Sequence, residues 1–159
     1  DCIYRRNQNN YPLIQKEEDL FQPISGNQYS LLDEISKDLK NKLPQDSVIV
    51  SPLSIGNHID HRIVHASLRF FEVSNLWFYA DYPYVVKNGT ELANFLSPDF
   101  TEQVFSLSPQ AMQTWQNAVA EYSSQISTFW KGKEEMFNRI DEYALNGGGK
   151  ILWKMGEQA

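Results

Sequence analysis

All three histidines of the chain lie close together, at His58, His61 and His65, and Asp60 stands among them. Imidazole nitrogens and carboxylate oxygens are the usual ligands of zinc, and a catalytic zinc site takes three protein ligands and leaves one position for water. An H-x-D-H cluster can supply a metal ligand, a second histidine that faces a substrate, and a carboxylate that fixes an imidazole tautomer. The spacing favours a catalytic metal site. The alternative is a solvated loop in which Asp60 only caps a helix.

His61 and His65 also have the i, i+4 spacing of a helical metal pair. The residues between them are Arg62-Ile-Val64, so the general-base glutamate of the H-E-x-x-H pattern is absent. We therefore expect His65 to belong to a helix face and not to bind metal.

The elements that must position this cluster are a strand, a loop and a helix. The β-branched run Val48–Val50 predicts a buried strand. A Pro/Ser/Gly loop follows, and an apolar helix then continues through Phe70 and Phe71. In open α/β sheets, ligands bind at the carboxyl ends of the strands. This pattern places His58, Asp60 and His61 at such an end.

A second apolar run, Leu76–Tyr79, predicts a central strand covered on both faces. Asp81-Tyr-Pro-Tyr84 follows it directly. One interpretation is a simple turn whose geometry Pro83 sets. The other places Asp81 and the aromatic rings on the rim of the site, at the same edge as His58.

The other elements follow from capping and periodicity. Residues 1–29 are rich in Asn, Gln, Pro and charge and predict a loop that crosses the surface. The capping pattern of Ser30-Leu-Leu-Asp33 predicts the start of one helix. Ser108-Pro109 predicts the start of another, whose apolar face continues to Ile126. The remaining predictions are strands at 100–107 and 151–153 and a helix at 131–145.

Composition sets the class of protein. The chain has 159 residues, of which 42% are hydrophobic and 21% charged, and this predicts a single ordinary globular domain. Its net charge of −6 argues against nucleic acid as a partner. No apolar run approaches the roughly 18 residues of a membrane span. The single Cys2 and the lack of a signal sequence favour a cytoplasmic protein. A homo-oligomer stays among the alternatives.

Four segments resemble a known family in the same order. Gly56-Asn-His-Ile-Asp-His-Arg-Ile-Val-His65 resembles the G-x-H-x-D-H loop of the PIG-L/LmbE-like zinc-dependent N-deacetylases. Asp1-Cys-Ile-Tyr-Arg-Arg6 resembles their Asp-x-x-Tyr-Arg segment, and Tyr79–Val85 resembles their Tyr-Glu-Asp-x-Pro-Tyr strand end, with Ala80 in place of the Glu. Tyr122-Ser-Ser-Gln125 resembles a late helix that ends in Ser-Gln.

The family's first signature, Ala-His-Pro-Asp-Asp-Glu, is absent from this chain. The resemblance therefore implies the C-terminal part of an α/β, Rossmann-like three-layer α/β/α domain. It also implies that a missing N-terminal segment of the same domain supplies two zinc ligands and the water-activating base. The alternative that this departure leaves open is a non-catalytic interaction module that keeps the fold without a complete metal site.

The resemblance implies a Zn²⁺-dependent hydrolase that removes an N-acyl group, typically acetyl, from an N-acetylated sugar or sugar conjugate. In that case His61 is the metal ligand. His58 faces the substrate carbonyl, where it stabilises the oxyanion or protonates the leaving amine, and Asp60 orients and charges His58.

Overall fold

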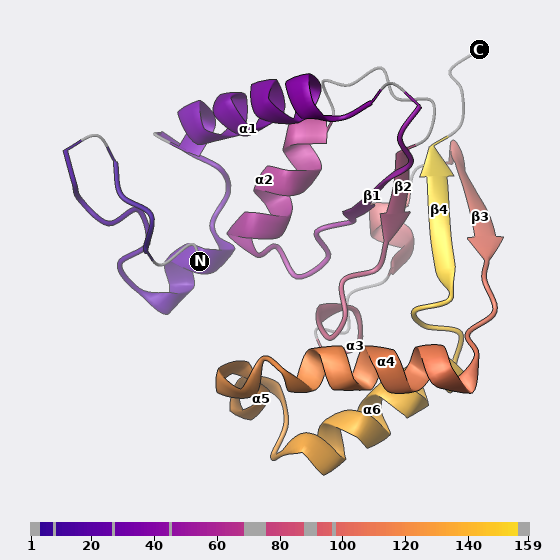
Figure 1. Cartoon of the computed structure of the whole chain (residues 1–159). Coiled ribbons are helices and arrows are strands. Elements are labelled where there is room, and N and C mark those ends of the chain that lie inside the picture. Colours follow the sequence, from indigo (N-terminus) through magenta and orange to yellow (C-terminus); the bar gives the residue numbers. More distant parts are fainter. Residues whose placement is uncertain are drawn as a thin grey trace. The chain divides into compact units, whose positions relative to one another are not determined.

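The computed structural model describes residues 4–7, 9–26, 28–44, 46–68, 76–87, 92–96 and 98–155. Its strands form a mixed four-stranded sheet in the order β1-β2-β4-β3, accompanied by helices (Figure 1). The α/β class expected from the sequence is confirmed. The strands are β1 Ile49–Pro52, β2 Leu76–Tyr79, β3 Phe100–Val104 and β4 Ile151–Met155. The helices are α1 Gln28–Lys42, α2 Ile59–Leu68, α3 Tyr84–Lys87, α4 Pro109–Ala120, α5 Ser123–Phe129 and α6 Lys133–Leu145, with short 3₁₀ turns η2 Glu17–Phe21 and η3 Leu92–Phe95.

The chain forms two compact units. The first comprises Asp1–Thr101 with Lys154–Ala159, and the second comprises Glu102–Trp153. All three histidines belong to the first unit. In the second, α4 and α6 pack together, with Met136, Ile140 and Ala144 buried on α6.

Strands β1 and β2 run parallel, and their pairing sets the position of everything that follows them. The register joins Ile49 to Leu76 at one end and Pro52 to Tyr79 at the other. The Leu53 N–H extends the ladder by donating to the Tyr79 carbonyl at 2.9 Å. Because parallel strands end at a common edge, the loop after β1 lies beside the residues after β2.

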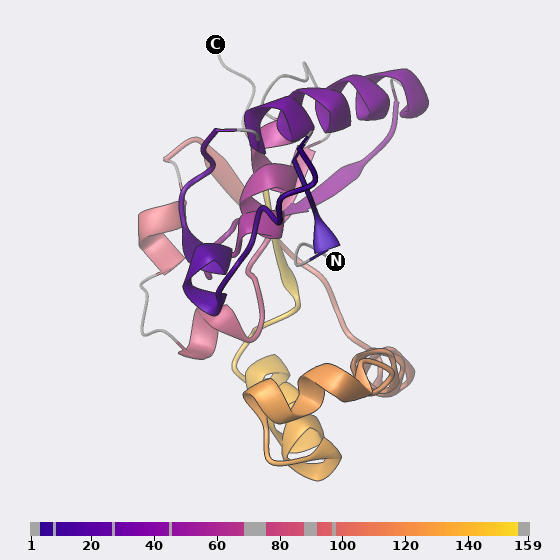
Figure 2. The same ribbon diagram turned by 90° about the vertical axis from the view of Figure 1, so that its left-hand side faces the viewer.

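A small apolar core holds the N-terminal segment against α1 and α2. Its buried members are Ile14, Leu32, Ile59 and Ile63, and the partly buried residues packed around them include Leu20 and Ile24. Both ribbon views place α1 across the end of α2 (Figures 1 and 2), where Ser36 Oγ lies 3.3 Å from the Ser67 carbonyl oxygen. The core therefore fixes the start of α2, which carries the histidines.

Three local predictions were wrong for reasons of tertiary context. The first strand runs over Ile49–Pro52, and the predicted run is not buried, since Val48 and Val50 are 63% and 48% exposed. The first helix begins at Gln28, so Ser30 lies inside its first turn, and the Gln28 side chain accepts a hydrogen bond from the Ser25 N–H at 3.0 Å. Strand β2 is not covered evenly on its two faces. Leu76 and Phe78 are buried, whereas the side chain of Tyr79 is 38% exposed.

Other predictions hold in part. Ser108 caps α4 by accepting the Ala111 N–H at 3.1 Å, as expected, but the helix stops at Ala120 and α5 begins separately. The N-terminal loop contains η2 and an antiparallel bridge between Arg6 and Pro12. Cys2, Phe70 and Phe71 lie outside the described residues. None of the helices in the described part of the chain has the length and apolar character that a membrane span requires.

Candidate active site at the carboxyl edge of β1 and β2

The loop between β1 and α2 is packed into the fold. Leu53 and Ile55 are buried, and both carbonyl and side-chain oxygens of Asn57 accept hydrogen bonds from the Arg62 guanidinium, at 3.0 and 2.8 Å. Gly56 lies directly under the ring of Tyr84, where an added Cβ would fall 2.2 Å from the ring. Only glycine allows the loop and α3 to approach this closely. The solvated-loop alternative does not describe these residues.

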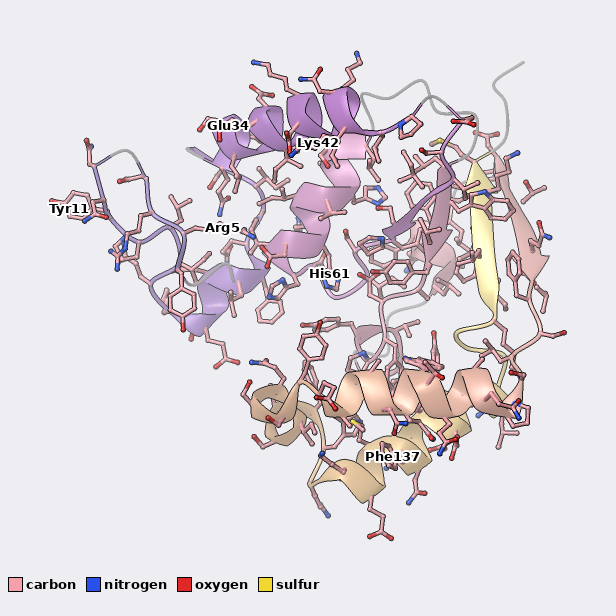
Figure 3. All side chains as sticks on the ribbon, viewed as in Figure 1. Arg5, Tyr11, Glu34, Lys42, His61 and Phe137 are labelled. Carbon is pink, nitrogen blue, oxygen red and sulfur yellow. The ribbon has the colours of Figure 1, made fainter. Side chains whose placement is uncertain are left out.

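His61 is held by a buried carboxylate. Its Nδ1 bonds to Asp81 Oδ1, and the other oxygen of Asp81 accepts the Ile55 N–H at 3.1 Å. Asp81 is 1% exposed, whereas the His61 side chain, seen on the first turn of α2 in Figure 3, is 31% exposed. Within the described residues no hydrogen bond or ion pair occupies Nε2 of His61. A carboxylate on one imidazole nitrogen fixes the ring and makes the other nitrogen a better metal ligand.

His58 takes the N-cap position of α2. Its carbonyl accepts the Arg62 N–H at 3.0 Å, and its Nδ1 accepts the Asp60 N–H at 3.3 Å. Because a backbone N–H can only donate, the neutral imidazole must carry its proton on Nε2. The rings of His58 and His61 lie 5.5 Å apart between centroids. The pair therefore offers one nitrogen acceptor, on His61, beside one N–H donor, on His58.

The surroundings favour the neutral form of His58. Burial is the main cause that lowers its pKa below 6.5, and the charges of His61 and Arg5 lower it further. The Asp60 carboxylate acts in the opposite direction and raises the pKa, with a smaller effect than burial. His58 consequently remains a neutral donor to lower pH than an exposed histidine.

Asp60 pairs with a residue from the N-terminal loop. Its carboxylate lies 2.5 Å from the Arg5 guanidinium, and both side chains are about one-third exposed, at 32% and 30%. The direct contact between Asp60 and His58 is made by the Asp60 backbone N–H, and the Asp60 carboxylate reaches His58 through its charge alone. Figure 3 shows Arg5 beside the start of α2. The sequence offered no signal for this ion pair beyond the position of Arg5 in the Asp-x-x-Tyr-Arg segment.

His65 has a different environment from the other two histidines. Its Nδ1 lies 2.8 Å from the Pro52 carbonyl oxygen, and its ring packs on Phe78 at a centroid distance of 5.1 Å. The Nδ1–H donates to that carbonyl and ties α2 to β1. This is the helix-face role expected for His65.

Aromatic rings surround the two site histidines. Tyr84 meets the His61 ring edge-on at 5.8 Å, and Phe21 meets His58 at 5.8 Å and Tyr84 at 6.5 Å. We call Phe21, His58, His61 and Tyr84 the ring cluster. At the end of β2, burial raises the pKa of Tyr79, and the Asp81 charge raises it further, so this phenol stays protonated at neutral pH.

The described residues contain no group of three His, Cys, Asp or Glu side chains placed to hold a metal ion. The atom that this arrangement offers to a metal ion is His61 Nε2, through its lone pair. The fit to a metal therefore rests on one imidazole with a carboxylate behind it, and any further ligands must come from outside the described residues.

Replacing Asp81 with asparagine is expected to weaken metal binding by about 10- to 100-fold, the usual effect of removing a carboxylate behind a ligand histidine. An asparagine whose oxygen accepts the Ile55 N–H turns its NH2 group toward His61 Nδ1, which can accept that hydrogen bond only in the tautomer that carries its proton on Nε2. In that tautomer Nε2 has no lone pair for a metal, so affinity is lost without a large loss of stability. Zinc titration measures the affinity, and thermal unfolding shows that the fold is kept. Asp60→Asn is the matched control, and equal zinc affinity in Asp81→Asn and wild type would contradict this role of Asp81.

No family model and no curated protein matches the chain. Two solved structures do. One is a deacetylase–teicoplanin complex from the biosynthesis pathway of teicoplanin, with a TM-score of 0.67, 23% identity and coverage of 100% of this chain and 65% of that chain. The other is a deacetylase triple mutant (Orf2*T) involved in the teicoplanin biosynthetic pathway, with a TM-score of 0.61 and 24% identity. The match covers 82% of this chain and 59% of that chain. The chain thus spans less than two-thirds of either structure, and the likeness supports the α/β, Rossmann-like fold.

Proposed function

We propose that this chain is part of a zinc-dependent hydrolase that removes an N-acetyl group from a sugar or sugar conjugate, as the resemblance to the PIG-L/LmbE-like deacetylases implies. The observation that carries the proposal is the Asp81–His61 pair, which holds one imidazole with Nε2 available beside the N–H donor of His58. Two structures with a similar fold are described as deacetylases, and one of them is a complex with teicoplanin, which supports a small-molecule substrate.

In this proposal His61 Nε2 is the one metal ligand that the chain contributes, and a segment upstream of Asp1 contributes the other ligands and the base. When bound, zinc supplies Lewis acidity toward the amide carbonyl and the attacking water. The carboxylate of Asp81 keeps the His61 ring in the one orientation that presents Nε2.

His58 acts on the substrate in its neutral form. Its Nε2–H donates to the carbonyl oxygen as negative charge develops there, which is the type of preorganised donor that stabilises an oxyanion. The lowered pKa of His58 and the occupied Nδ1 favour this role over proton transfer from an imidazolium. Asp60 and Arg5 set the local charge around the ring.

The test uses the complete protein, including the sequence upstream of Asp1, loaded with zinc and incubated with a panel of N-acetylated amino sugars. Release of free amine, followed by an amine-reactive fluorophore, is the expected result. Removal of metal with a chelator should abolish it, and added zinc should restore it. Folded, zinc-loaded protein that released no amine from any member of the panel would contradict the proposal and favour the interaction module.

A further inference from the structure

The turn η2 presents one aromatic side chain to the site while its neighbours anchor the turn. Leu20 and Ile24 pack against the core formed with α1 and α2. Phe21, between them, remains 39% exposed and lies against His58 and Tyr84. In Figure 1 the indigo N-terminal segment accordingly lies beside the start of α2.

The exposure of Phe21 is unfavourable for a purely structural residue. Full burial of such a side chain contributes roughly 1.5–3 kcal/mol, and Phe21 realises only part of this. Its contact with His58 is edge-to-face, with 84° between the ring planes. Binding sites for small molecules combine aromatic surface with a few directed polar groups. The ring cluster has this composition.

We propose that Phe21 is a specificity-determining residue that packs against the apolar C–H face of the substrate's sugar ring, on the side of the ring cluster formed by His58. This inference rests on the proposed function. A pyranose presents a flat patch of axial C–H groups, which suits the face of an aromatic ring, while its hydroxyls require polar partners. Glu17 and Glu18 stand on the same turn with exposed carboxylates, and Glu18 lies 3.8 Å from the Lys16 ammonium group. Carboxylates accept hydrogen bonds from hydroxyls.

An acyl chain is the competing occupant of this surface, and it fits less well. A hydrocarbon chain gains nothing from the carboxylates of η2, which must remain solvated. The proposal therefore assigns Phe21 to the amine side of the scissile amide, and it predicts that Phe21 senses the sugar and not the length of the acyl group.

The experiment measures binding by saturation-transfer NMR on the complete protein without added zinc, so that no turnover is needed. The probes are N-acetylglucosamine, its N-butanoyl and N-hexanoyl analogues, and N-acetylethanolamine, which has the amide but no ring. Phe21→Ala should weaken binding of every sugar probe by about 3- to 10-fold. It should leave N-acetylethanolamine unchanged, and Phe21→Trp should restore sugar binding.

The matched control is Phe105→Ala, because Phe105 is 41% exposed but lies in the other unit, outside the ring cluster. Equal sugar binding by wild type and Phe21→Ala, or no sugar binding by wild type, overturns the inference. A loss that grows with acyl length also overturns it, in favour of an acyl site. If the sugar binds through Phe21 but no amine is released in the assay above, the result contradicts the proposed reaction and still supports the contact between Phe21 and the sugar.

Discussion

Substitution of His61 by alanine is expected to remove bound zinc and deacylation together, leaving the activity of the metal-free protein. The reason is that His61 Nε2 is the ligand nitrogen in the proposed site, and a catalytic zinc has only three protein ligands to lose. Metal content by elemental analysis and amine release measure the two outcomes. His61→Ala that retained one zinc per chain would contradict the assignment of His61.

The alanine variant also disturbs the fold, because it leaves the buried Asp81 carboxylate without the imidazole that it bonds. An unsatisfied buried acceptor costs about 1–3 kcal/mol. His61→Asn separates the two effects, since its amide nitrogen can occupy the place of Nδ1 and donate to Asp81, whereas no atom replaces Nε2. This variant should unfold close to the wild-type temperature and still fail to bind zinc.

Substitution of His58 by alanine is expected to keep zinc and to reduce turnover by about 100- to 10,000-fold, the range for loss of a catalytic acid, base or donor. The His58→Asn variant is the matched control for structure. Its side-chain oxygen can accept the Asp60 N–H and cap α2, but it has no donor at the position of Nε2. Full activity of His58→Ala with zinc bound would exclude the proposed role. A pure capping role instead predicts a loss of about 1 kcal/mol of stability and an unchanged rate.

The pH profile tests which protonation state of His58 works. The pKa of His58 is lowered, so the neutral donor persists below pH 6.5, and activity should fall only as the pH drops through that lowered pKa. Asp60→Asn removes a charge that raises the pKa, and it should move this acid limb to lower pH. Arg5→Gln removes a charge that lowers the pKa, and it should move the limb to higher pH. Activity that instead rose on protonation of His58 would show that His58 acts as a general acid.

Several features of the site were predictable from the sequence alone. The β-branched run, the Pro/Ser/Gly loop and the apolar helix predicted a strand, loop and helix around His58–His65, and the apolar run Leu76–Tyr79 matches β2 residue for residue. These are local patterns of periodicity and turn chemistry. Because carboxyl ends of parallel strands share an edge, one of the two interpretations of Asp81 placed it at the same edge as His58.

The pairings within that edge were decided only by the tertiary structure. The register of β1 and β2 decides whether Asp81 bonds to His61 or only ends a turn, since a shift of one residue turns each side chain to the opposite face. Arg5 and Phe21 come from a segment without periodicity, and the apolar core around Ile14 brings that segment to α2. The sequence determined which chemical groups reach this edge of the sheet. Long-range packing determined which of them touch, because contact energies between distant segments leave no local pattern in the chain.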